Sequence, residues 1–118
     1  MSVEFILINE TKKEMVSFAY LNGSKMCELA GNAAQSAIVT WYLLNNQGDH
    51  IQFVSDTHQD WPFKTGNKQN AWSYLDKTDD LIKELIDQLV LKDNGFLYQD
   101  EVDPENLYVR DIVNVWKN

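Results

Sequence analysis

Residues 3–8 read Val-Glu-Phe-Ile-Leu-Ile, a run with apolar side chains at both odd and even positions. Successive side chains of a β-strand point to opposite sides of the sheet, so this run would bury apolar groups on both faces. We therefore expect a strand over residues 3–8 whose two faces are both covered. A second strand over residues 15–20 would pair with it as a hairpin across the polar residues 11–13.

The clearest helical signal begins at Thr78, which we expect to cap the N-terminus of a helix. Two aspartates follow in the first turn, where the helix dipole favours negative charge. An apolar stripe then recurs at helical spacing through Leu81, Ile82, Leu85, Ile86, Leu89 and Val90. We expect this helix to pass Lys92 and to close at Asn94-Gly95. A last strand is expected over residues 107–116, where side-chain character alternates.

The segment over residues 33–46 admits two interpretations. Asn32 is a good N-cap and the alanines that follow favour a helix. Residues 38–42, Ile-Val-Thr-Trp-Tyr, are instead typical strand formers, so a strand stays open as the alternative. Around this segment we expect a short helix that Ser24 caps and that runs through Ala30, a strand over residues 50–55 and a long irregular loop over residues 56–70.

These elements do not alternate strictly, which favours an α+β fold with a mainly antiparallel sheet and two or three helices packed on one face. The chain of 118 residues, 44% hydrophobic, is long enough for one core, and we expect a single globular domain over residues 1–118. Trp41 and Trp116 lie on apolar patterns and are expected in that core. Cys27 is expected to be a small buried hydrophobe.

The charge excludes some classes of function. Ten basic residues against 18 acidic ones give a net charge of −8, which argues against binding to nucleic acid, because that requires Lys and Arg to neutralise phosphates.

No apolar run reaches the roughly 20 residues that a membrane span needs. The first residues lack the basic segment of a secretory signal, and the single cysteine fits a reducing compartment. We therefore expect a soluble, cytoplasmic protein without a membrane partner and without a cofactor; its oligomeric state stays open.

Aromatic residues beside acids suggest a protein-binding surface, because aromatic side chains anchor many protein interfaces. Trp61 and Trp72 stand in a polar stretch, and either fold inward as anchors of the loop or form an exposed contact. Tyr98 precedes an uncompensated acidic group, formed by Asp100, Glu101, Asp103 and Glu105. An exposed acidic loop alone would explain that group, but such charges would also steer a basic protein partner.

Both histidines lie in one polar region that offers a weaker alternative. His50, Asp56, His58 and Asp60 combine imidazole and carboxylate groups, which can ligate a divalent metal or perform general acid–base chemistry. Their spacing matches no metal-binding signature, and a solvated polar loop has the same composition.

Several short motifs together resemble a group of short, acidic, uncharacterised bacterial proteins. They are Glu28-Leu29-Ala30-Gly31-Asn32, residues 40–46, Gly48-Asp49, residues 53–57, Asp60-Trp61-Pro62-Phe63, Asp93-Asn94-Gly95 and Tyr108-Val109-Arg110. The resemblance covers most of the chain and implies no catalytic residue. In size and acidity the chain is also similar to the immunity proteins that neutralise bacterial toxins, a likeness of composition that transfers neither a fold nor a site.

The sequence thus favours a small acidic protein-binding domain, of the kind that inhibits a basic toxin or nuclease. Its acids would set the association rate, and its exposed aromatics would set the dissociation rate. The alternative is a metal-assisted or general acid–base enzyme that uses His50, Asp56, His58 and Asp60.

Overall fold

The computed structural model describes residues 4–55 and 61–116, which form an α+β fold with four helices and six strands in two sheets. The larger sheet consists of β1 (Phe5–Asn9), β2 (Glu14–Ser17), β3 (Ile51–Ser55) and β4 (Leu75–Asp76). Its strands lie in the order β3-β1-β2-β4, and neighbouring strands are antiparallel except for β2 and β4, which are parallel. The smaller sheet is an antiparallel pair, β5 (Leu91–Gln99) and β6 (Tyr108–Asn114). The helices are α1 (Met26–Gly31), α2 (Ala33–Asn45), α3 (Lys68–Ala71) and α4 (Thr78–Asp87).

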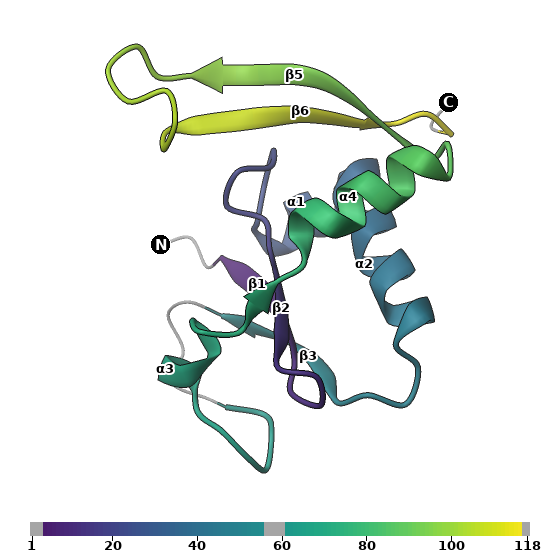
Figure 1. Cartoon of the computed structure of the whole chain (residues 1–118), viewed down its shortest axis with the longest axis vertical. Helices are drawn as coiled ribbons and strands as arrows, with labels where there is room; N and C mark the ends of the chain where they lie inside the picture. Colours follow the sequence, from purple (N-terminus) through teal and green to yellow (C-terminus); the bar gives the residue numbers. More distant parts are fainter. Residues whose placement is uncertain (1–3, 56–60, 117–118) are drawn as a thin grey trace.

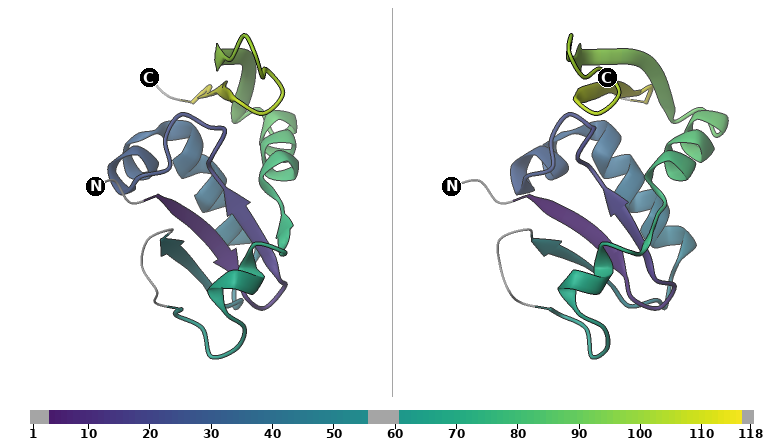
Figure 2. Two further views of the ribbon diagram at one scale, coloured as in Figure 1. Left: turned by 90° about the vertical axis from the view of Figure 1, so that its left-hand side faces the viewer. Right: turned by 60° about the vertical axis from the view of Figure 1, so that its left-hand side comes forward.

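The central strand β1 is covered on both faces, as its sequence predicts. Leu7 belongs to the main core cluster, which gathers apolar side chains of β2, α2 and α4. Ile8, the next residue, belongs to a second cluster with Met15, Val54 and Ala71. Adjacent residues of one strand therefore serve two different cores, and the sheet lies between α2 and the segment that carries α3 (Figures 1 and 2).

The ambiguous segment over residues 33–46 is a helix, α2. The Asn32 side chain accepts hydrogen bonds from the backbone N–H groups of Ala34 (2.9 Å) and Gln35 (3.4 Å), which satisfies two donors that the first turn leaves free. The strand-forming residues in its middle do not override this start, because Ile38 and Tyr42 reach the core from one side of the helix. The strand interpretation is therefore wrong.

Helix α4 ends earlier than the sequence predicts. Its last turn closes with two hydrogen bonds, from Val90 N–H to Leu85 O (2.9 Å) and from Leu89 N–H to Ile86 O (3.0 Å). This is the Schellman arrangement, and the residue that adopts its left-handed conformation is Leu89, with φ of 63°. The expected end at Asn94-Gly95 is wrong: Gly95, with φ of 98°, lies instead inside β5 beside an irregularity in its pairing.

Four smaller expectations are also corrected. Thr78 does not cap α4, since its hydroxyl bonds to Ser17, and Asp76 accepts the Thr78 N–H instead. Trp116 is 74% exposed rather than part of the core, whereas Trp41 packs against the core as expected. Cys27 is exposed. Ser24 donates to Glu4 and precedes α1 without capping it.

The loop expected over residues 56–70 is only partly described: α3 begins within it at Lys68, and β4 follows at Leu75. In the described part of the chain, no helix is both long enough and apolar enough to cross a lipid bilayer.

Candidate protein-binding surface

The β5–β6 hairpin lies apart from the larger sheet and extends across one end of the molecule (Figures 1 and 2). It is anchored along β6. Ile112 is buried in the main core, Asn114 donates from its side chain to Ala33 O (3.1 Å), and Arg110 N–H donates to Tyr20 O (2.8 Å). The Tyr108 ring stacks on the Tyr20 ring with 4.4 Å between centroids. The body of the protein therefore holds β6, whereas β5 has no other strand beside it among the described residues.

The outer parts of the hairpin carry large apolar side chains that the fold does not bury. Phe96, Leu97, Tyr98 and Leu107 each expose slightly more than half of their surface, and Val102 in the connecting loop is 93% exposed. Single exposed apolar residues are normal on a protein surface, but five on one hairpin form a concentration of the kind found at interfaces.

The acidic loop of this hairpin has a defined shape. The Asp100 carboxylate accepts the backbone N–H groups of Val102 (2.9 Å) and Asp103 (2.8 Å) and the Tyr98 hydroxyl (2.9 Å). The Asp103 N–H, the Tyr98 hydroxyl and the Val102 N–H together lower the pKa of Asp100, because each bond favours the charged carboxylate. The hydrogen bond to Asp100 raises the pKa of Tyr98 in turn. Asp100 thus organises the loop that displays its neighbours.

Two acids of this loop are exposed to solvent. Glu101 and Glu105 are exposed, and neither forms an ion pair with another described residue. The hairpin's arginine, Arg110, is already engaged with Asp79 (2.7 Å) and Asp93 (3.5 Å), which ties the hairpin to α4. The loop therefore presents an acidic surface that its own arginine does not neutralise.

Trp61 and Trp72, the two tryptophans considered for the binding surface, lie away from this loop. Trp61 is half-buried against the second core cluster; its ring lies 5.0 Å from that of Phe63, and its indole N–H donates to Thr65 O (2.7 Å). Trp72 is 58% exposed directly after α3, which lies at the end of the molecule opposite the hairpin. The structure thus brings Tyr98 and the four acids together and separates both tryptophans from them.

The histidine region is described only in part. Asp56, His58 and Asp60 lie outside the described residues. His50 is exposed, and its backbone bonds to Thr11 and Glu10 at the start of β3. Among residues 4–55 and 61–116, no group of three or more His, Cys, Asp or Glu side chains is placed to hold a metal ion.

Sequence reasoning missed Phe96, Leu97 and Val102, because Asn94-Gly95 matched a helix C-cap that an exposed acidic loop would follow. Leu107 was expected in the last strand, over residues 107–116, but not as a contact residue. One signal could have identified the strand. Phe96 and Tyr98 are strand formers at alternate positions, and they shortly precede the strand predicted over residues 107–116.

Comparisons with protein-family models, with curated proteins and with solved structures found no match to this chain.

Proposed function

We propose that this protein binds a basic protein partner through the β5–β6 hairpin, as an immunity-type inhibitor of a cationic toxin or nuclease would. The observation that carries the proposal is the exposed apolar set on the hairpin, Phe96, Leu97, Tyr98, Val102 and Leu107. It lies beside Glu101 and Glu105, which form no ion pair with another residue of the described chain. An interface needs both parts: apolar groups slow dissociation, and like-signed charges accelerate association with a partner of opposite charge.

The whole-molecule charge supports the same partner chemistry. A net charge of −8 repels acidic proteins and attracts cationic ones over about 8–10 Å in physiological salt. The mechanism would be occlusion: the hairpin tip would cover a cationic surface of the partner, and the ordered Asp100 loop would reduce the entropy lost on binding.

Two matched sets of variants test the proposal. Glu101→Gln with Glu105→Gln removes charge without touching the Asp100 bonds that shape the loop. Val102→Ser with Leu107→Ser removes apolar surface from the same loop. The control is Glu84→Gln with Asp87→Asn, which removes two acids from α4.

Each variant is compared with the natural protein in a pull-down from lysate of the source cells, followed by binding kinetics on the purified partner. We expect a basic partner, association slowed several-fold and less dependent on salt in the charge variant, and dissociation accelerated in the apolar variant. Equal rates for both hairpin variants and the control would refute the proposal.

A further inference from the structure

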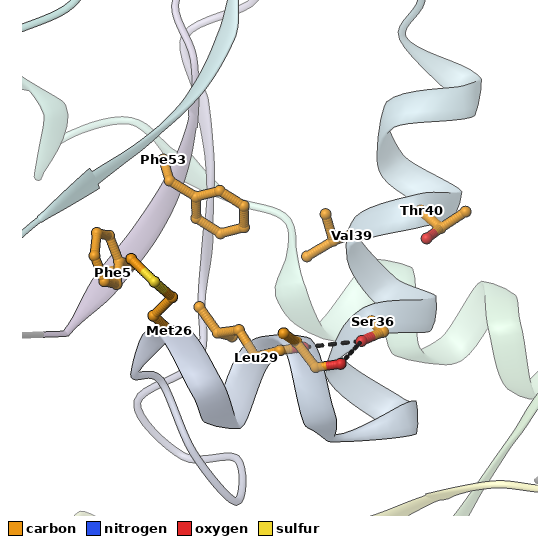
Figure 3. Close-up of a pocket in the computed structure, with 8 residues that line it drawn as sticks. Phe5, Met26, Leu29, Ser36, Val39, Thr40 and Phe53 are labelled. Atoms are coloured by element: carbon orange, nitrogen blue, oxygen red, sulfur yellow. Dashed lines mark hydrogen bonds between the residues drawn. The ribbon is translucent and has the colours of Figure 1, made fainter.

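A second surface feature is a concave apolar pocket between the larger sheet and helices α1 and α2 (Figure 3). Phe5 and Phe53 approach it from β1 and β3, Met26 and Leu29 from α1, and Val39 from α2. Its volume is about 390 Å³, within the range of roughly 300–1,000 Å³ typical of small-molecule sites. None of the residues that line it belongs to the β5–β6 hairpin, so this inference does not depend on the proposed function.

The walls of the pocket are held in place. The Phe53 ring lies between two others, with centroid distances of 6.3 Å to Phe5 and 6.4 Å to Phe18. On the helical side, the Ser36 hydroxyl donates to Leu29 O (2.8 Å), which ties α2 to α1. The pocket is thus largely formed before any ligand arrives, and binding would not require the fold to open it.

The chemistry of the lining defines the ligand. Its described residues include no charged side chain, and of its two hydroxyls, that of Ser36 is already bonded within the protein. An ion would lose hydration without gaining a counter-charge, and an anion would also meet the protein's charge of −8. A neutral hydrocarbon chain or ring would replace water along these walls and gain dispersion contacts.

We propose that this pocket binds a neutral, apolar small molecule, with Phe5, Phe53, Leu29 and Val39 as the walls and Met26 at the mouth. Met26 is 68% exposed, and its flexible thioether side chain can close over ligands of different shape. A cavity of about 150 Å³ with similar walls accommodates benzene, so a larger one suits a medium-length chain or a two-ring compound.

The test uses the full chain and two ligands that share a ten-carbon chain and differ in the charge of the head group. Fluorescence of N-phenyl-1-naphthylamine reports occupancy, and 1-decanol and decanoate compete for it. We expect the dye to bind with a stoichiometry of about one, and 1-decanol to displace it at least tenfold more effectively than decanoate, given the uncharged lining. Absence of dye binding, or equal competition by the two ligands, would overturn the proposal.

Variants then locate the site. Ala30→Phe fills the pocket from an exposed position of α1, and we expect it to lower dye affinity at least tenfold. Leu44→Phe adds a ring to an exposed position of α2 outside the pocket and should leave affinity unchanged. Met26→Ala trims the mouth without altering the core, and a loss of several-fold is expected even if Ala30→Phe fails to fold. Unchanged affinity in Met26→Ala and in a folded Ala30→Phe would refute the assignment, as would a dimer, seen by sedimentation, that excludes the dye.

Discussion

The Thr78 hydroxyl accepts a hydrogen bond from the backbone N–H of Ser17 at 2.8 Å, across 61 residues of sequence. It donates in turn to the Asp76 carboxylate at 2.6 Å. The bond lies where β2 ends and α4 begins, so it fixes the start of the helix to the end of β2. Thr78 is itself buried, and its hydroxyl supplies the hydrogen-bond acceptor that the Ser17 N–H would otherwise have to find in water.

Thr78→Val should destabilise the protein by about 1–3 kcal/mol, because it keeps the shape of the side chain and leaves the Ser17 N–H without its acceptor. Urea denaturation measures this change. Thr78→Ser retains the hydroxyl and should cost less than the valine variant. An unchanged stability in Thr78→Val would contradict the role given to the hydrogen bond, whereas equal losses in the two variants would show that the methyl group contributes as much as the hydroxyl.

Leu89→Gly should stabilise the protein by about 0.5–1 kcal/mol. Leu89 adopts φ of 63° at the end of α4, a conformation that costs a non-glycine residue roughly 1–2 kcal/mol and that glycine adopts freely. Its side chain is 75% exposed, so little packing is lost, and the Trp116 indole donates to its backbone oxygen, which glycine keeps. Thermal unfolding checks this, with Leu89→Ala as the control that retains the strain and should show no gain.

Tyr74→Phe should raise the pKa of Glu10. Burial raises that pKa, but hydrogen bonds from Lys13 (2.7 Å) and Tyr74 (2.9 Å) outweigh it, so the net shift is downward. A carboxyl whose pKa is lowered on folding contributes stability above its unfolded pKa of about 4.3 and loses it as pH falls through the folded value.

The destabilisation caused by Tyr74→Phe should therefore be larger at pH 7 than at pH 3, where Glu10 is increasingly protonated. Carbon-detected NMR titration of the Glu10 carboxyl, together with urea denaturation at both pH values, measures the two effects. An unchanged titration of Glu10 in the variant would contradict the role given to the Tyr74 hydroxyl.

Asn32→Ala should destabilise the protein by about 1 kcal/mol, because two N–H groups at the start of α2 lose the side-chain oxygen that they share. Asn32→Asp keeps the acceptor and should cost much less. Denaturant titration of the three proteins distinguishes a lost cap from a general intolerance of substitution at this position.

Local sequence patterns were sufficient to predict those features that depend on interactions between residues close together in the sequence. The two-faced character of β1, the cap at Asn32 and the acidic first turn of α4 all follow from neighbouring residues, and the α+β class followed from them. The acids of residues 100–105 were likewise recognised from composition, and the structure places them with Tyr98 on one hairpin.

Other features depended on contacts between distant segments. An apolar stripe at helical spacing continued through Leu89 and Val90, but α4 stops at Asp87, because pairing of Leu91 with Asn114 and burial of Ile112 draw the following residues into a strand. Local propensity differs between helix and strand by less than about 1 kcal/mol per residue, so burial and ladder pairing decide such segments. The exposure of Trp116, the placement of Trp61 against the second core cluster and the pocket between α1, α2 and the sheet likewise depend on which distant segments meet after the chain has folded.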